Sequence, residues 1–174
     1  MPPTEEIFDV CDEHDRVIGT APRSRVHAEW LLHRAVHVFV FNSRGQLLLQ
    51  RRSATKDESP LKLTSSTSGH LGAGESYETA AIREMQEEIG LTGPLEFLVK
   101  LPASQETANE HTVLYRMMSD AEPTPDPAEI LRMEVVSLPQ VQRMLAEDPD
   151  DFSSPLRVLL RWYFEQPQLM ESHR

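Results

Sequence analysis

Hydrophobic and polar residues alternate with the period of β-strands along much of the chain, and helical periodicity is confined to a few segments. IFDVCD (7–12) and RVIGTAPR (16–23) predict the two strands of an N-terminal hairpin. RAVHVFVFN (34–42) and QLLLQRRS (46–53), joined by a Ser-Arg-Gly turn, predict a second hairpin. The first third of the chain is therefore expected to be rich in β-structure.

The rest of the chain adds further strands and places most of its helices at the end. Segment 61–68 has the β-branched and hydroxyl residues of a strand, whereas 53–60 and 121–127 are polar or proline-rich and predict loops. Mixed strands around one central helix predict an α+β fold arranged in α/β/α layers. The other predicted strands are 94–102, 111–119 and 129–138, and the other predicted helices are 23–31, 139–148 and 153–166, the last with Ser154 as its N-cap.

Length and composition limit the class of protein. The 174 residues, 39% of them hydrophobic, suit one domain over residues 1–174 with a real core. The single cysteine, Cys11, cannot form an internal disulfide, and the longest apolar run is too short to cross a bilayer. The N-terminus lacks the basic and then apolar order of a signal peptide. We therefore expect a cytoplasmic protein.

The net charge of −11 bears on the binding partners. Nucleic acids and anionic membranes attract basic surfaces, so this charge argues against both. A phosphorylated small molecule remains a candidate partner if a cation neutralises its charge.

The segment GHLGAGESYETAAIREMQEEIGL (69–91) contains the best-specified helix. Ser76 can cap its start and Gly90 can close its end, which predicts a helix over 76–89. One arc of this helix is apolar and is expected to pack on the sheet. The apolar arc consists of Ala81, Ile82, Met85 and Ile89.

Three glutamates of this helix, Glu84, Glu87 and Glu88, lie three and four residues apart and would share an arc of roughly 100 degrees. Like charges at this spacing cost roughly 0.2 to 0.5 kcal/mol per pair, and no lysine lies one turn away within the helix. Carboxylates are hard oxygen ligands, which magnesium accepts together with phosphate oxygens and waters. A divalent ion would therefore turn the repulsion into a binding site.

Nine positions of this segment resemble the Nudix box, the signature of the Nudix hydrolase superfamily. They match, without a spacing error, the pattern G, five residues, E, seven residues, R-E-apolar-any-E-E-any-G-apolar. The resemblance covers residues 69–91 and implies the Nudix fold, a mixed β-sheet in an α/β/α sandwich. It also implies hydrolysis of a nucleoside diphosphate or a related diphosphate linked to another group. The matching residues are Gly69, Glu75, Arg83, Glu84, Met85, Glu87, Glu88, Gly90 and Leu91.

The resemblance implies roles for the charged residues of the box. Glu84, Glu87 and Glu88 match the metal-binding glutamates of the family, and the expected ion is Mg²⁺, with Mn²⁺ as its substitute. Arg83 matches the arginine that orients these glutamates, and Glu75 is its expected neighbour. Water would attack phosphorus while the metal polarises the phosphoryl oxygens.

A finer resemblance concerns residues 31–57 and the later Ser-Gly-His. Both are similar to the isopentenyl-diphosphate isomerases, a branch of the same superfamily that moves a double bond. Those isomerases place a catalytic cysteine where this chain has Ser68, and a serine does not supply thiol chemistry. The intact glutamates favour hydrolysis, with isomerisation and a non-catalytic Nudix-like binding module as alternatives.

The isomerase branch also suggests residues outside the box. Arg52 and Lys56 align with a basic pair that binds the diphosphate, which makes them candidate substrate-binding residues. His27, His33 and His70 fall, together with a glutamate, near the positions where the isomerases hold a second metal.

That glutamate, Glu110, is also a candidate general base. Many Nudix enzymes draw their base from the loop before a strand, and here both Glu106 and Glu110 occupy such a loop. The sequence does not choose between them, nor among nucleoside di- or triphosphates, nucleotide sugars and prenyl diphosphates as substrates. Many relatives form dimers, so a homodimer is an open expectation.

Overall fold

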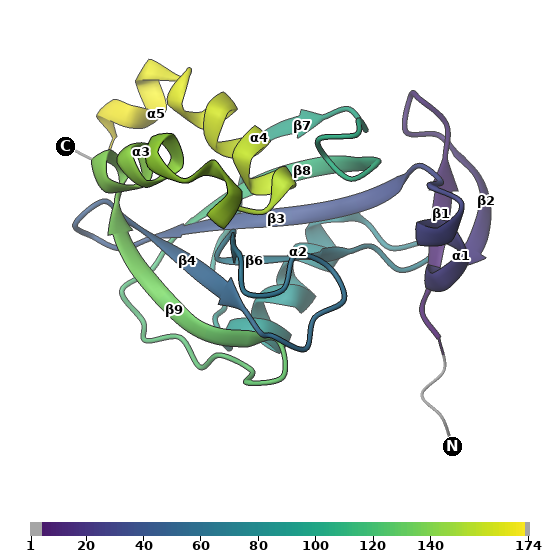
Figure 1. Ribbon diagram of the computed structural model, residues 1–174, viewed down its shortest axis with the longest axis horizontal. Coiled ribbons are helices and arrows are strands. Elements are labelled where there is room, and N and C mark those ends of the chain that lie inside the picture. The colour runs from purple at the N-terminus through teal and green to yellow at the C-terminus, as the bar shows by residue number, and fades with distance from the viewer. Residues whose placement is uncertain (1–4, 173–174) are drawn as a thin grey trace.

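The computed structural model describes residues 5–172, and a seven-stranded mixed β-sheet forms its centre (Figure 1). The sheet is mixed because β3 and β8 run parallel, whereas the other strand pairs are antiparallel. This confirms the predicted α+β class. The strands of the sheet are β3 (His33–Phe41), β4 (Gln46–Arg52), β5 (Leu63–Thr64), β6 (Thr67–His70), β7 (Glu96–Leu101), β8 (Glu110–Met118) and β9 (Ile130–Ser137).

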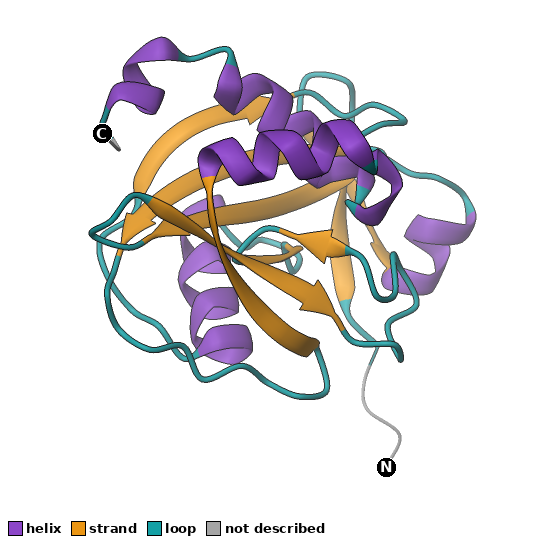
Figure 2. Ribbon diagram, turned by 60° about the vertical axis from the view of Figure 1, so that its left-hand side comes forward, coloured by secondary structure: helices purple, strands orange, loops and turns teal. Residues whose placement is uncertain are grey.

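Helices cover both faces of the sheet, as Figure 2 shows. Alternation along β3 creates the two faces: Val36 and Val38 pack against the box helix, while Phe39 and Phe41 pack against the C-terminal helices. The predicted α/β/α layering is therefore confirmed. The box helix consists of α2 (Tyr77–Glu84) and the π-helical turn η1 (Met85–Ile89). The opposite layer consists of α3 (Leu138–Glu147), the short η2 (Pro149–Asp151), α4 (Ser154–Phe164) and α5 (Pro167–Glu171).

The N-terminal hairpin forms a separate two-stranded sheet beside the main one (Figure 1). Phe8 makes an isolated bridge to Gly72 of the box loop, and the Cys11 amide donates to the Leu32 carbonyl. The hairpin thereby carries the short helix that follows it to the rim of the site. The elements are β1 (Ile7–Cys11), β2 (Val17–Pro22) and α1 (Arg23–Ala28). Residues 1–4 of the segment compared with signal peptides lie outside the described residues.

Two details of the predicted helices are wrong. Ser153, and not Ser154, is the N-cap of α4, because the Ser153 amide donates to the Leu63 carbonyl and its backbone stays extended. The box helix is not a regular α-helix throughout, since it widens into a π-helix over its last five residues before Gly90 ends it with φ 66°. Single π-turns inside helices occur frequently at functional sites.

The central sheet splits beside β3, and this split creates space for a site. β3 pairs with β4 only at Val40–Leu48 and Phe41–Leu47, after which the two strands diverge. β6 then fills the edge of β3, while β5 pairs with the far end of β4. No helix within residues 5–172 is long and apolar enough to cross a membrane.

Candidate active site

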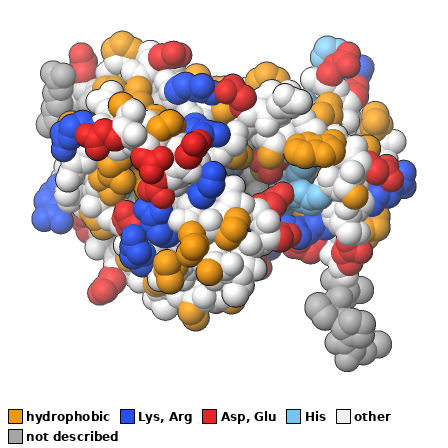
Figure 3. All heavy atoms as spheres, viewed as in Figure 1, with side chains coloured by type: hydrophobic (Ala, Val, Ile, Leu, Met, Phe, Trp, Pro, Cys, Tyr) orange, Lys and Arg blue, Asp and Glu red, His pale blue; other side chains and the backbone are white. Residues whose placement is uncertain are grey.

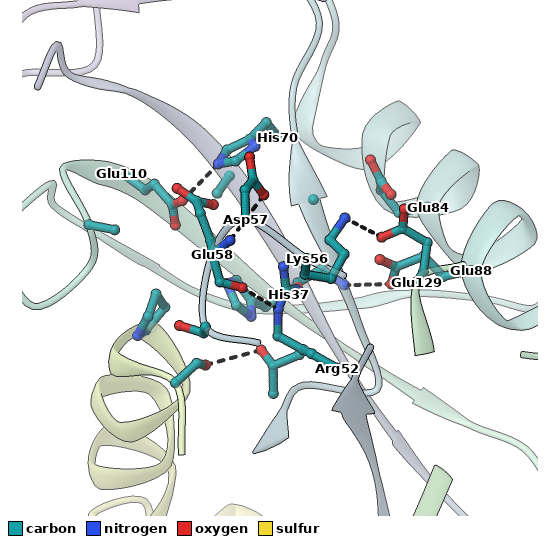
Figure 4. Close-up of a pocket in the computed structure, with 18 of the residues that line it drawn as sticks. His37, Arg52, Lys56, Asp57, Glu58, His70, Glu84, Glu88, Glu110 and Glu129 are labelled. Carbon is teal, nitrogen blue, oxygen red and sulfur yellow. Dashed lines mark hydrogen bonds and ion pairs between the residues drawn. The ribbon is translucent and has the colours of Figure 1, made fainter. Parts of the chain in front are cut away.

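A cavity of about 850 Å³ lies where β3 and β4 diverge. On the face shown in Figure 3, acidic and basic side chains are interspersed, and histidine atoms are visible in a recess beside the N-terminal hairpin. The close-up in Figure 4 shows Glu84, Glu88 and Glu129 on one side of the cavity and His70 and Glu110 on the other. The cavity therefore brings together residues that the sequence places far apart.

The three glutamates of the box helix differ in how far their side chains are exposed to solvent. Ser76 caps the helix by accepting a hydrogen bond from the Thr79 amide, as predicted. The side chain of Glu88 is buried at the cavity and that of Glu84 is 13% exposed, whereas that of Glu87 is 60% exposed. The predicted shared arc needs a correction in exposure only, because all three glutamates line the cavity. The apolar arc also needs correction, because Ala81, Met85 and Ile89 are buried but Ile82 is 43% exposed.

Glu88 is held from three sides. Its Oε2 accepts hydrogen bonds from Gln50 Nε2 at 2.9 Å, from the Ser68 amide at 3.1 Å and from the Thr67 hydroxyl. Burial raises the pKa of Glu88 despite these donors. Among the described residues Glu88 has no cationic partner, so its ionised form lacks a counter-charge in the metal-free protein.

Arg83 connects the box loop to the box helix. Its guanidinium makes two 2.9 Å hydrogen bonds to the Glu75 carboxylate and one of 3.1 Å to the His70 carbonyl. It also donates to Glu84 at 2.7 Å and to Glu87 at 3.2 Å. The expected Arg83–Glu75 contact is therefore present, and its fork geometry fixes the orientation of the guanidinium.

Glu84 stands close to a second buried carboxylate. Burial first, and then the neighbouring Glu88, raise the pKa of Glu84 to about 8, although Arg83 acts in the opposite direction. Two carboxyl groups that resist ionisation together, one buried and one largely buried, are suited to a hard divalent cation, whose charge would favour both ionised forms. The donor set therefore fits Mg²⁺ or Mn²⁺.

Arg52 and Lys56 both line the cavity, as expected for a phosphate-binding pair. Arg52 Nε donates to the Glu58 carbonyl at 2.9 Å, and the Lys56 ammonium pairs with Glu129. Glu129 was not singled out from the sequence. It faces the cavity because β9 pairs with β4 and because the Asp126 amide donates to the Glu88 carbonyl at 2.8 Å, contacts that no local pattern reveals.

The three candidate histidines meet at one end of the cavity, although they come from three different elements. The potential ligand atoms of His27, His33 and His70 all lie within 4.8 Å of one another. Nε2 of His27 and Nε2 of His33 are buried without a hydrogen-bond partner. Such orphaned nitrogens fit a metal-binding cluster, because buried polar atoms are normally satisfied.

Glu110 completes this cluster, and Glu106 lies outside it. Glu110 Oε1 is 2.9 Å from His70 Nε2 and 3.8 Å from His33 Nε2. Burial raises the pKa of Glu110 to about 8. Glu106 does not line the cavity and instead pairs with Arg161 at 2.9 Å. Of the two candidate bases, therefore, the fold brings only Glu110 to the site.

The fold and the site define a protein of the Nudix class. The family model of the NUDIX domain matches residues 31–162, and the chain belongs to the Nudix family. The structure of DR0079 from Deinococcus radiodurans is similar to this one, with a TM-score of 0.73 and 30% sequence identity, over 82% of this chain and 90% of that chain.

Two sequence relatives carry different names, one that of an isomerase and the other that of an uncharacterised hydrolase. Isopentenyl-diphosphate Delta-isomerase 2 of Photorhabdus laumondii is 35% identical over 156 residues, or 86% of this chain and 87% of the relative. An uncharacterised Nudix hydrolase of Streptomyces coelicolor is 43% identical over 93 residues, or 53% of this chain and 51% of the relative. The alignment with the isomerase is therefore longer, whereas the sequence identity to the hydrolase is higher over a shorter alignment.

Proposed function

We propose that this protein is a metal-dependent hydrolase of a nucleoside diphosphate or a related diphosphate linked to another group. The observation that carries the proposal is a pair of carboxyl groups, the largely buried Glu84 and the buried Glu88, which face one cavity and together favour a divalent cation. An ordinary solvent-exposed acidic face does not explain this arrangement, because glutamate side chains are normally exposed to water and have no reason to turn into a cavity.

In this proposal Glu84, Glu87 and Glu88 hold Mg²⁺ or Mn²⁺. When bound, the ion polarises the phosphoryl oxygens and lowers the pKa of an attacking water. Arg83 acts as a positioning residue, because its hydrogen bonds to Glu75 and Glu84 set the direction of the Glu84 carboxylate. Glu87 is the most exposed of the three, and its carboxylate accepts a hydrogen bond from Arg83.

Arg52 and Lys56 are proposed to bind the diphosphate. The Lys56 ammonium would then leave Glu129 and turn to a phosphate oxygen, which frees a further carboxylate beside the box glutamates. Glu58, Glu110 and Glu129 are the three buried or half-buried glutamates of the cavity, outside the box, from which a general base is to be sought.

Isomerisation of isopentenyl diphosphate is the second candidate, favoured by the 35% identity to an isomerase. Two observations argue against it. Ser68 takes the place of the catalytic cysteine, and the only apolar side chains among the described lining residues are those of Ala35, Ala108 and Pro155. An isopentenyl chain would find little apolar surface there, whereas a polar group would find many partners.

We also propose that His27, His33, His70 and Glu110 hold a second metal ion. The two orphaned histidine nitrogens support this, and they would gain a partner when the ion binds. Zinc titration of the wild type and of His33→Gln, followed by calorimetry, tests the site without any substrate. Equal zinc binding by both proteins would contradict it.

The test of the function is a panel of diphosphates incubated with Mg²⁺ in ¹⁸O-labelled water. The panel contains nucleoside di- and triphosphates, nucleotide sugars and isopentenyl diphosphate, and Glu88→Gln is the matched control. Hydrolysis that places ¹⁸O in a phosphate product, and that Glu88→Gln loses, supports the proposal. Rearrangement of isopentenyl diphosphate would favour the isomerase, and tight binding without turnover would favour a binding module.

A further inference from the structure

His37 lies on the floor of the cavity, and the proposed hydrolysis gives it no role so far. It belongs to β3, is 4% exposed and lines the cavity. Figure 4 places its imidazole between the carboxylates on one side and Glu110 with His70 on the other. Nδ1 lies 2.7 Å from the Ser65 hydroxyl, whereas Nε2 has no hydrogen-bond partner among the described residues.

The Ser65 contact determines which ring nitrogen carries the proton. Ser65 is fully buried, and its hydroxyl has His37 Nδ1 as its only partner within residues 5–172. A buried hydroxyl proton without an acceptor costs roughly 1 to 3 kcal/mol, so the Ser65 hydroxyl donates to Nδ1. A neutral imidazole that accepts at Nδ1 carries its proton on Nε2. The nitrogen that faces the cavity is therefore a donor.

The imidazole stays neutral while it presents this donor. Burial, with His70 and Arg52 as weaker causes, lowers the pKa of His37 to about 3. A neutral donor is not drawn into an ion pair with the surrounding carboxylates, unlike Lys56 with Glu129 and Arg83 with its glutamates. His37 thus offers an N–H donor without a hydrogen-bond acceptor among the described residues, whereas Lys56 and Arg83 already form ion pairs with carboxylates.

We propose that His37 contacts the substrate directly and that its Nε2–H donates a hydrogen bond to a non-bridging phosphoryl oxygen of the diphosphate. This inference rests on the proposed function for its ligand. Phosphoryl oxygens are acceptors only, so they match a donor with a fixed proton. The same proton excludes His37 Nε2 as a metal ligand or a general base, because both roles need its lone pair.

The tautomer is tested first, by ¹⁵N NMR of the wild type with labelled histidine. We expect the His37 signal of a neutral ring protonated at Nε2 from pH 6 to pH 8. Ser65→Ala removes the donor to Nδ1, and we expect the tautomer preference of His37 to weaken in this variant. A wild-type ring protonated at Nδ1 would overturn the proposal, whatever the activity of the protein.

The contact is tested with two substitutions of similar size. His37→Gln keeps an N–H donor, and His37→Met removes it. For His37→Met we expect weaker binding of methylenediphosphonate, a non-hydrolysable diphosphate analogue, and lower kcat/KM, both on the order of tenfold to a hundredfold. For His37→Gln we expect values within about threefold of wild type, since one neutral donor replaces another.

Equal losses in His37→Gln and His37→Met would indicate a purely structural residue and would overturn the proposal, as would unchanged binding in His37→Met. Melting curves of both variants identify any loss that comes from folding alone. If the wild type hydrolyses no diphosphate, the proposed function fails, and the methylenediphosphonate titration with Mg²⁺ still decides whether His37 contacts a diphosphate. No binding of this analogue by the wild type would overturn the proposed contact, and the hydrolysis panel alone would decide the proposed function.

Discussion

The backbone of Gly69 lies against the carboxylate of Glu84. A Cβ atom built on Gly69 would lie 2.2 Å from both Cδ and Oε1 of Glu84, so no side chain fits there unless Glu84 moves. Gly69 cannot retreat, because it pairs with Val36 in the sheet. The first glycine of the box therefore serves close packing against a site glutamate and not a special backbone conformation.

Gly69→Ala is expected to displace Glu84 and to lower hydrolysis. A shift of about 1 Å at a catalytic group can cost about a hundredfold in rate, so we expect a loss of that order in kcat/KM. Gly19→Ala is the matched control, because nothing lies within 4 Å of its added Cβ. Steady-state kinetics of both variants measure the effect, and full activity of Gly69→Ala would contradict the proposed role of Glu84.

Magnesium is expected to stabilise the wild type by mass action, by about 2.7 kcal/mol at a hundredfold excess over Kd. Glu88→Gln should show a smaller shift of the melting temperature with Mg²⁺. Without metal, however, Glu88→Gln should melt slightly higher than wild type above about pH 8, because Glu84 is ionised there and the substitution removes its like-charge contact with Glu88, worth at least a few tenths of a kcal/mol. Melting curves with and without Mg²⁺ provide the measurement.

Glu87→Gln is the second variant to be measured in the same melting experiment. Glu87 is exposed and touches Arg83, so its neutralisation should change the metal-free stability less than Glu88→Gln does. We still expect reduced turnover and a reduced magnesium shift, since Glu87 is a proposed ligand. Equal magnesium shifts in all three proteins, with unchanged hydrolysis, would refute the metal site on the box helix.

Ser68→Ala separates the hydrolase from the isomerase. The Ser68 amide, and not its hydroxyl, donates to Glu88, so removal of the hydroxyl should leave most hydrolysis intact. A thousandfold loss in rate, equivalent to about 4 kcal/mol of barrier, would instead assign the hydroxyl a catalytic role. Ser68→Cys is the informative partner: we expect it to hydrolyse diphosphates and not to rearrange isopentenyl diphosphate.

The folded protein should lose stability below neutral pH through His37. Its pKa falls from an ordinary value of 6.5 to about 3 on folding, so the unfolded chain binds the extra proton between these values. Well above pH 6.5 the ring is neutral in both states and the free energy of unfolding does not depend on pH through His37; below pH 6.5, protonation of the unfolded chain lowers that free energy. Relative to His37→Gln, wild type should lose about 2 kcal/mol between pH 7 and pH 5. Urea denaturation at both values measures this, and a constant difference would contradict it.

Short-range patterns account for much of the box and of the strands. Ser76, Gly90 and the apolar positions around Met85 act within a few residues of each other, and the ends of the box helix follow from them. The apolar run along β3 predicts a strand, and the structure buries both of its faces, since adjacent side chains point to opposite sides of a sheet. The box spacing likewise predicts the family without any coordinates.

Long-range packing accounts for what the patterns miss. Glu84 and Glu88 differ from Glu87 in burial because the π-turn and the neighbouring strand β6 enclose one side of the helix, which helical periodicity alone does not express. Glu110 reaches the histidines through the parallel pairing of β8 with β3, where it lies opposite His33, while Glu106 only a few residues earlier pairs with α4.

Long-range packing also brings Glu129 and His37 to the cavity. The sequence around each is that of an ordinary surface or core residue, and neither belongs to a motif. The divergence of β3 from β4 opens the cavity, β9 carries Glu129 to its edge, and the buried Ser65 hydroxyl turns the imidazole of His37 toward it. Such positions depend on contacts between strands distant in sequence, whose side chains meet only after the sheet has assembled.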